Sequence, residues 1–301
     1  MILKIAWDKS YVLDLPEGHR FPMIKYELIH DQLLYEGLVA EENFFSPGLL
    51  SEEIILLTHT KEYWSKLKNG LLSPSEIRKT GFPFSAALIE RERIITEGSR
   101  MAALYALENK VALNIAGGTH HAYSDRGEGF CLFNDIAVSA NYLIHHQYLE
   151  KVLVIDLDVH QGNGTAKIFE DRKEVFTFSM HGANNYPLKK EQSDLDIGLP
   201  DKTSDEEYLR ILKENLPQLF KKHQPQIVFY QSGVDVLSTD KLGKLSLSRE
   251  GCKERDQLVL QQCFSNSVPV VISMGGGYSS RISDIVESHC NTFRVVREIY
   301  F

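Results

Sequence analysis

Residues 152–164 read VLVIDLDVHQGNG, and this stretch decides the fold. It opens on a run, Val152–Leu157, that is apolar except for Asp156 and has the length and β-branched content typical of a strand buried on both faces. Asp158 and His160 follow directly, so polar side chains gather where the strand ends. In open parallel sheets, ligands bind beyond the carboxyl ends of the strands. The stretch therefore predicts a buried parallel sheet with a functional site at this edge.

Short apolar runs of the same kind recur along the chain, with amphipathic segments between them. This alternation predicts one α/β domain over residues 1–301, with a mostly parallel central sheet and helices on both faces. The charged segment Lys189–Asp196 is interpreted as a surface loop within that domain. The predicted strands are Leu3–Trp7, Val111–Ala116, Val152–Leu157, Val175–Ser179, Ile227–Gln231, Val270–Met274 and Phe293–Arg297. The predicted helices are Met23–Glu36, Ser85–Glu108, Asn134–His146, Asp205–Lys222, Arg249–Phe264 and Arg281–Ser288.

Composition narrows the class of function. The 301 residues carry 33 Lys and Arg against 41 Asp and Glu, a net charge of −8, which gives no overall field to hold a nucleic acid. The four cysteines form no C-x-x-C pair and are interpreted as free thiols. Residues 1–14 lack the features of a signal peptide, and no apolar run is long enough to cross a membrane. We expect a cytoplasmic protein that binds neither nucleic acid nor membrane.

Asp158, His160 and Asp235 offer two carboxylates and an imidazole, a donor set that suits Zn²⁺, with Fe²⁺ as the alternative metal. Positions i and i+2 of a strand share a face, so Asp158 and His160 are expected to point the same way. Taken alone, the three residues could equally be a chance D-x-H with a turn-capping Asp235. Gly162 and Leu237, two positions beyond His160 and Asp235, cannot ligate, which favours one metal over two.

Two adjacent histidines, His120 and His121, follow Gly117-Gly118 at the end of another predicted strand. Asp156 could accept a hydrogen bond from one ring and favour its charged form. Asn163 is neutral and could orient the other ring without raising its pKa. This division predicts one histidine that supplies charge and one that acts as a base.

Tyr278 follows three glycines, which would bring the backbone close to a ligand and leave room for the phenol to point inward. A phenol beside a metal can donate to a developing oxyanion, which amide hydrolysis requires. The alternatives are an ordinary turn with a packing tyrosine, or a phosphate loop, although no phosphate-loop motif is present. Phe130 and Tyr186 could form a slot for an aliphatic chain, or could belong to the core.

Four segments together resemble the zinc-dependent histone deacetylase family, which has the arginase/deacetylase fold. They are GGTHHA at 117–122, GFCLFND at 129–135, DLDVHQGNG at 156–164 and GGGY at 275–278. The resemblance implies that Asp158, His160 and Asp235 bind zinc. It also implies that His121 is the general base and acid, that His120 is its electrostatic partner, and that Tyr278 polarises the carbonyl.

The same resemblance implies further sites. A potassium ion would be held by Asp156, by the backbone oxygens of Asp158 and His160, and by Ser179 and Met180. Gly129, Phe130, Tyr186, Leu242 and Gly276 would line the substrate channel. Arg20 would lie beside an inner product channel, the alternative being a surface or structural ion pair.

Asn163 and Gln161 are similar to the class IV branch of the family and to bacterial proteins like it. The expected activity is hydrolysis of an N-acyl amide, acetyl or longer, on a lysine side chain of a peptide or protein. A small acylated amine, such as an acetylpolyamine, is the alternative substrate, although Leu242 stands where polyamine enzymes place a carboxylate. The acidic clamp that binds peptides in many members is not evident in residues 76–80. A silent acyl-lysine binding protein is disfavoured because every catalytic position is filled.

Overall fold

The computed structural model describes residues 2–301, in which eight strands form one sheet in the order β2-β1-β3-β8-β7-β4-β5-β6. Every strand pair is parallel. The strands are β1 (Lys4–Ala6), β2 (Phe44–Phe45), β3 (Val111–Asn114), β4 (Val152–Asp156), β5 (Val175–Gly182), β6 (Leu195–Leu199), β7 (Ile227–Gln231) and β8 (Val270–Ser273). The predicted α/β class with a parallel sheet is confirmed.

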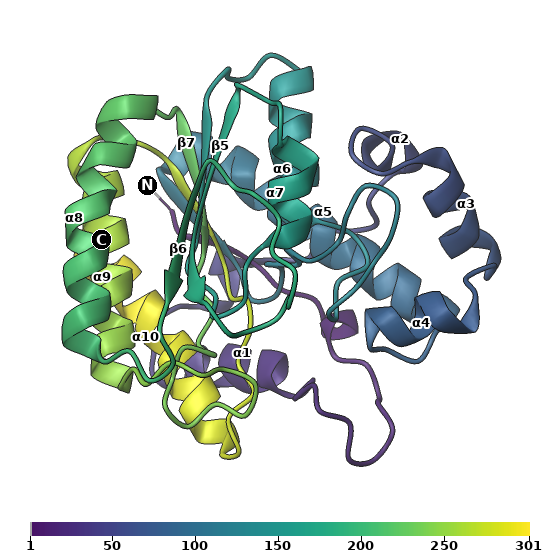
Figure 1. Ribbon diagram of the computed structural model, residues 1–301, viewed down its shortest axis with the longest axis horizontal. Coiled ribbons are helices and arrows are strands. Elements are labelled where there is room, and N and C mark those ends of the chain that lie inside the picture. The colour runs from purple at the N-terminus through teal and green to yellow at the C-terminus, as the bar shows by residue number, and fades with distance from the viewer. Residues whose placement is uncertain (1) are drawn as a thin grey trace.

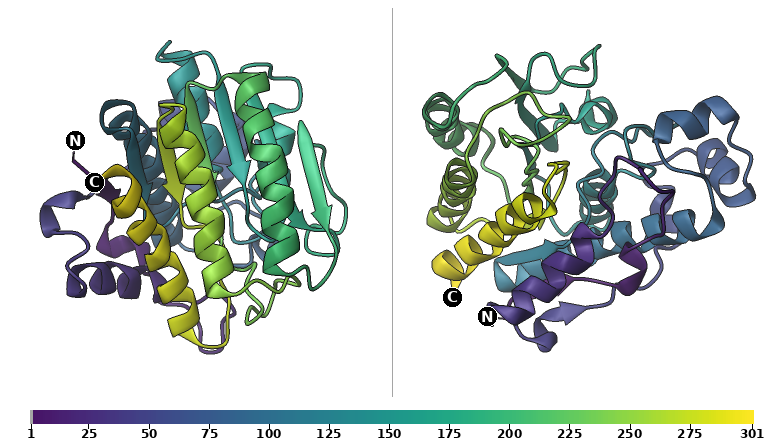
Figure 2. Two further views of the ribbon diagram at one scale, coloured as in Figure 1. Left: turned by 90° about the vertical axis from the view of Figure 1, so that its left-hand side faces the viewer. Right: turned by 90° about the horizontal axis from the view of Figure 1, so that it is seen from below.

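Helices cover both faces of this sheet (Figure 1). One face carries α5 (Ala86–Asn109), α6 (Asp135–His145) and α7 (Asn163–Phe169). The other carries α1 (Lys25–Tyr35), α8 (Asp205–His223), α9 (Arg249–Ser265) and α10 (Ile282–Tyr300), and the last three lie side by side in Figure 2. The short helices α2 (Glu52–Ile55), α3 (Lys61–Asn69) and α4 (Pro74–Thr80) lie beyond α5.

The central strands are buried on both faces, which explains their apolar sequences. All five residues of β4 and all five of β7 are buried, and so are all four of β3 and of β8. Burial of this kind is expected where helices cover both sides of a parallel sheet. Within residues 2–301, no helix has both the length and the apolar character needed to cross a bilayer.

Six of the seven predicted strands coincide with observed strands, and all six predicted helices are present. The prediction of a strand at Phe293–Arg297 is wrong, because this segment lies inside α10. The buried residues of α10 include Ile285, His289, Phe293, Val296 and Tyr300, a spacing of three and four residues that belongs to a helix. A five-residue apolar run does not distinguish the two structures.

Two edge strands were not predicted. β2 has only two residues, and β6 begins at Leu195, inside the segment interpreted as a surface loop. β6 is mostly half-buried and carries Asp196, whose carboxylate accepts from the backbone N–H of Ser193 and from the amide of Gln161. An edge strand with one face toward solvent lacks the continuous apolar run of a central strand.

Candidate active site

Four neighbouring strands, β3, β8, β7 and β4, deliver the polar segments to one edge of the sheet. Asp158 and His160 follow β4, and Asp235 follows β7, its neighbour. One ligating atom from each lies within 4.8 Å of the others, and the three residues are 1%, 8% and 0% exposed. The fold therefore brings the three predicted metal ligands into a single buried cluster.

The donor set of this cluster fits a divalent metal. Nδ1 of His160 lies 3.0 Å from Oδ1 of Asp158 and 3.1 Å from Oδ2 of Asp235. Burial and the neighbouring Asp158 carboxylate raise the pKa of Asp235 to about 7. Among residues 2–301, no Lys or Arg pairs with either carboxylate. Two buried carboxylates that repel one another need a cation between them, and an Asp-His-Asp set suits Zn²⁺.

A glycine makes this arrangement fit. The N–H of Gly276 donates to Oδ2 of Asp158 at 2.8 Å, so the loop after β8 is tied to the cluster. A Cβ at Gly276 would lie 1.9 Å from Oδ2 of Asp235. Any larger residue would displace the carboxylates. Gly276 therefore supports the ligand cluster directly.

His120 and His121 are presented by the turn after β3. Asp135, the first residue of α6, accepts from the N–H of Gly118 at 3.1 Å and from the N–H and hydroxyl of Thr119, both at 2.7 Å. The carboxylate therefore fixes the turn that carries the histidines. Both rings are buried, with centroids 4.1 Å apart.

The two rings have different partners. Nδ1 of His120 lies 2.7 Å from Oδ2 of Asp156, whereas Nδ1 of His121 lies 2.6 Å from Oδ1 of Asn163. The amide nitrogen of Asn163 donates to the carboxylate of Glu128 at 2.6 Å, which fixes the amide orientation. Because Oδ1 of Asn163 can only accept, His121 carries its proton on Nδ1. Its Nε2 is left with a free lone pair.

These partners move the two pKa values in opposite directions. Burial opposes charge on His120, but the carboxylates of Asp156 and Asp158 outweigh it and raise the pKa of His120. Burial lowers the pKa of His121 well below its usual value, and His120 and His160 lower it further. The surroundings therefore favour the charged form of His120 and the neutral form of His121.

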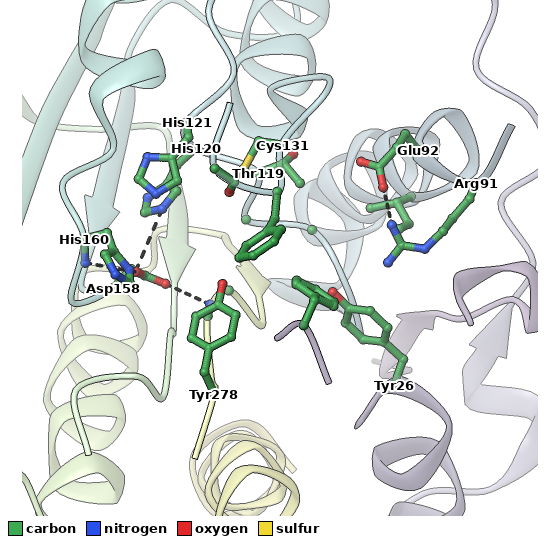
Figure 3. A pocket seen from close by; sticks show the side chains of 18 residues that line it. Tyr26, Arg91, Glu92, Thr119, His120, His121, Cys131, Asp158, His160 and Tyr278 are labelled. Atoms are coloured by element: carbon green, nitrogen blue, oxygen red, sulfur yellow. Dashed lines mark hydrogen bonds and ion pairs between the residues drawn. The ribbon is translucent and has the colours of Figure 1, made fainter. Parts of the chain in front are cut away.

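Tyr278 is half-buried and projects its hydroxyl into the pocket shared with the histidines and Asp158 (Figure 3). Its backbone N–H donates to Oδ2 of Asp240 at 2.6 Å, which anchors the residue after the glycines. Burial raises its pKa well above the usual value, and Asp235 and Asp158 add to the effect. The phenol is therefore held in the protonated form that can donate.

The residues assigned to potassium by resemblance also gather at this edge. Asp156 pairs in register with Ser179 of β5, and Asp158, His160 and Met180 lie buried in the same region. Oδ1 of Asp156 accepts from the N–H of Asp158 at 3.2 Å, and the Ser179 hydroxyl lies 2.9 Å from Nδ1 of His181.

An outer pocket of about 300 Å³ opens beside the cluster. The predicted channel residues Gly129, Phe130, Tyr186 and Leu242 all line it, together with His121, His160 and Tyr278. The ring of Tyr186, which is 41% exposed, meets the His121 ring edge-on at 5.0 Å. An extended side chain entering here would pass between aromatic groups to reach the metal ligands.

A smaller inner cavity lies on the other side of the same residues. The volume within which the centre of a water molecule can lie is about 40 Å³. The residues that line this cavity include Gly276, Cys131, Arg91 and Glu92 (Figure 3). His121, Gly129, Phe130, His160 and Tyr278 line both spaces, so the two adjoin at these residues.

The implied position of Arg20 in an inner channel is not found. Arg20 is exposed and lines the outer pocket, because the adjacent Phe21 is the side chain that turns inward and is buried. The arginine of the inner cavity is Arg91, which is 3% exposed and paired with Glu92. It lies in a run, Glu90-Arg91-Glu92-Arg93, that resembles an exposed helix face in the sequence.

Other residues of the site were not predicted. Lys25 is fully buried at the start of α1, and its ammonium donates to the carbonyl of Gly275 at 3.0 Å. Asp240 and Glu128 hold Tyr278 and Asn163 in place. Asp135 could have been found, since it ends a quoted motif. Lys25 lies five residues after Arg20, inside the predicted helix Met23–Glu36, and no sequence signal identified it as part of the site.

The fold is an α/β domain with an all-parallel sheet, and a buried Asp-His-Asp cluster lies at the carboxyl edge of that sheet. These two features place the chain among α/β proteins with a metal site. The histone deacetylase domain family matches residues 19–293 of this chain. An uncharacterized protein of Picosynechococcus sp. is 40% identical over 98% of this chain and 99% of its own length. Histone deacetylase 2 of Arabidopsis thaliana is 30% identical over 96% of this chain and 78% of its own. The chain belongs to the histone deacetylase domain family.

Two further similarities agree with this assignment. The acetoin utilization protein AcuC of Staphylococcus aureus is 27% identical over 90% of this chain and 76% of its own length. The crystal structure of the HDA15 HD domain superposes with a TM-score of 0.81 at 20% identity, covering 97% of this chain and 90% of that one. The latter shows a shared fold.

Proposed function

We propose that this protein is a zinc-dependent deacylase that hydrolyses an N-acyl amide, acetyl or longer, on a lysine side chain, giving a free amine and a carboxylate. One observation carries the proposal. The Asp158, His160 and Asp235 cluster lies beside a cavity lined by His121, which has a free Nε2, and by Tyr278, which presents a hydroxyl. Metal-dependent amide hydrolysis combines a metal, a base and an oxyanion donor.

Asp158, His160 and Asp235 would hold the metal, with Zn²⁺ favoured over Fe²⁺. When bound, Zn²⁺ would supply Lewis acidity that polarises the amide carbonyl and acidifies water. Asp156, Ser179, Met180 and the backbone of Asp158 and His160 would hold a potassium ion. That site would add positive charge beside His120 and the metal ligands.

The side chains divide the remaining chemistry among them. Nε2 of His121 takes a proton from the attacking water and delivers it to the leaving amine nitrogen. The Tyr278 hydroxyl donates to the carbonyl oxygen as negative charge develops on it. His120, kept protonated by Asp156, stabilises the same charge. Phe130 and Tyr186 orient the chain that carries the amide.

The pairing of His121 with a neutral amide also supports a class IV-like assignment within the family. A carboxylate at position 163 would raise the pKa of His121, whereas the amide orients the ring with little effect on its charge. We assign this chain to the class IV-like branch on Asn163 and Gln161.

Metal removal and reloading test the proposal. Protein stripped of metal should release no acetate from an acetyl-lysine peptide, and stoichiometric Zn²⁺ should restore the release. Asp235→Asn, reloaded in parallel, should stay inactive. Turnover by metal-free protein, or by Asp235→Asn at the wild-type rate, would contradict the proposal. Fe²⁺ reloading distinguishes the two candidate metals.

A further inference from the structure

We propose that the outer pocket selects acyl amides whose amine component carries an anionic group, a carboxylate or a phosphate, close to the scissile bond. This inference rests on the proposed function and names its substrate class. Four basic residues line the pocket, Arg20, Arg78, Lys79 and Lys244, and no acidic residue lines it among the residues described. The protein as a whole carries a net charge of −8, so the local charge at this opening is opposite in sign to the net charge of the protein.

The basic groups converge from separate parts of the chain. Arg20 comes from the loop before α1, Arg78 and Lys79 from the last turn of α4, and Lys244 from the loop that follows Asp240. Cations in a last helical turn stabilise the helix end, which could account for Arg78 and Lys79 alone. It does not account for Arg20 and Lys244.

The fold fixes α4 against the channel wall. The N–H of Gly129 donates to the carbonyl of Lys79 at 2.9 Å, and that of Phe130 donates to the carbonyl of Thr80 at 2.8 Å. The basic last turn of α4 is thereby held beside the channel residues. Lys244 is also anchored, because its ammonium donates to the carbonyl of Asn184 at 2.9 Å.

The basic side chains of the pocket have no acidic partner, whereas the nearby carboxylates accept hydrogen bonds from other groups. None of the four basic side chains forms an ion pair within residues 2–301. Glu128 accepts from the amide of Asn163 at 2.6 Å. Asp240 accepts from the backbone N–H groups of Leu242, Gly243 and Tyr278, and Asp201 accepts from Asn184. The charged side chains that line the opening are therefore all basic, and the nearby carboxylates are turned to other hydrogen-bond donors.

A neighbouring hollow continues this field. It is lined by Arg20 and Lys241 and shares Leu242 and Tyr278 with the outer pocket, again without an acidic lining residue. Like charges gathered within one Debye length act together on an approaching ligand. A cationic amine such as a polyamine would be repelled at the point where an anionic one is attracted.

Three small amides of one shape test the inference. They are 5-acetamidopentanoate, N-acetylputrescine and neutral N-pentylacetamide, which place an anion, a cation or a methyl group at the same distance from the amide. We expect kcat/KM for acetate release to be roughly tenfold higher for the anion than for the cation at low salt, with the neutral amide between them. The ratio should shrink to about twofold at 0.5 M salt.

Substitution identifies the source of the preference. Arg78→Gln combined with Lys79→Gln should lower the ratio of anion to cation to roughly threefold, because Arg20 and Lys244 remain in the lining. Lys221→Gln combined with Lys222→Gln, the same loss of two charges in the exposed last turn of α8, should leave the ratio unchanged. Acetyl-lysine peptides flanked by Asp or by Arg show whether the anion belongs to a peptide or to a small molecule.

The outcomes separate the two proposals. Turnover of the neutral amide with no advantage for the anion overturns the anionic preference and leaves the deacylase intact. An advantage for N-acetylputrescine also overturns it, in favour of a polyamine substrate. No carboxylate release from these amides, or from acetyl-lysine and longer acyl-lysine peptides, by zinc-loaded protein overturns the proposed function, and this inference with it.

Discussion

Nδ1 of His121 lies 2.6 Å from the amide oxygen of Asn163, whereas the adjacent ring of His120 faces a carboxylate. Because Glu128 holds the amide nitrogen of Asn163, the amide oxygen is fixed toward His121. The consequence is a single tautomer of His121, with Nε2 unprotonated. In the proposed mechanism His121 is the base, and this arrangement disfavours its unproductive tautomer and ring orientations.

Asn163→Ala is therefore expected to lower kcat by roughly ten- to a hundredfold with little change in KM, because the ring of His121 loses its orienting acceptor. Asn163→Asp keeps an acceptor at the same position and should retain more activity than the alanine variant. Steady-state kinetics on an acetyl-lysine peptide measures both. Equal losses in the two variants would show that orientation is not the role of this residue.

Tyr278→Phe removes the hydroxyl that donates to the developing oxyanion in the proposed mechanism. We expect kcat to fall by roughly two or more orders of magnitude, while the protein still binds one zinc ion. Kinetics combined with metal analysis distinguishes this result from a collapsed site. Unchanged turnover would remove Tyr278 from the mechanism.

Gly276→Ala should abolish stoichiometric zinc binding. The added Cβ would lie 1.9 Å from Oδ2 of Asp235, and the carboxylate has to move away from His160. Gly198→Ala in β6 is the matched control, since its Cβ would meet Ala183 at no less than 3.4 Å. Zinc titration of both proteins checks the prediction, and full zinc affinity in Gly276→Ala would refute it.

The surroundings of His59 predict that the folded protein loses stability in acid. Its Nδ1 lies 3.0 Å from the carbonyl of Tyr123, and its Nε2 accepts from the N–H of Asn134 at 3.1 Å, so the folded state requires the neutral ring. Burial lowers its pKa from 6.5 to about 4. The unfolded chain therefore binds the proton first as the pH falls.

This contribution is fully present above pH 6.5 and is lost as the pH falls toward and through 4. Between pH 7.5 and pH 5, protonation of His59 in the unfolded chain should lower the free energy of unfolding by about 2 kcal/mol. Urea unfolding at pH 7.5 and pH 5 gives the change in the free energy of unfolding with pH for the wild type and for His59→Gln. The wild type should lose more stability between the two pH values than the variant. Equal pH dependence of the two proteins would show that His59 is not held neutral.

The sequence was sufficient to predict the central sheet because β4, β7 and β8 are buried on both faces and carry continuous apolar runs. It was insufficient for Phe293–Arg297, where a short apolar run has the composition of a strand and the burial of a helix. The edge strand β6 was missed for the opposite reason, since an exposed face interrupts the apolar pattern.

The site was predictable where it follows strand ends. Asp158, His160 and Asp235 converge because neighbouring parallel strands end at one edge. Lys25 and Arg91 were not predictable, because they reach the site from helices and burial of a charged helical residue depends on tertiary packing. Arg20 was misplaced because local sequence does not say which of two adjacent residues, Arg20 or Phe21, turns inward.

One titration tests the central claim most directly. Metal-free protein receives Zn²⁺ in steps while bound zinc and acetate release from an acetyl-lysine peptide are measured on the same samples. We predict that turnover rises in proportion to bound zinc and reaches its maximum at one equivalent, and that Asp235→Asn shows neither binding nor turnover at that ratio. Full turnover without metal, or a zinc-saturated site that releases no carboxylate from any acetyl-lysine or longer acyl-lysine substrate, would contradict the account.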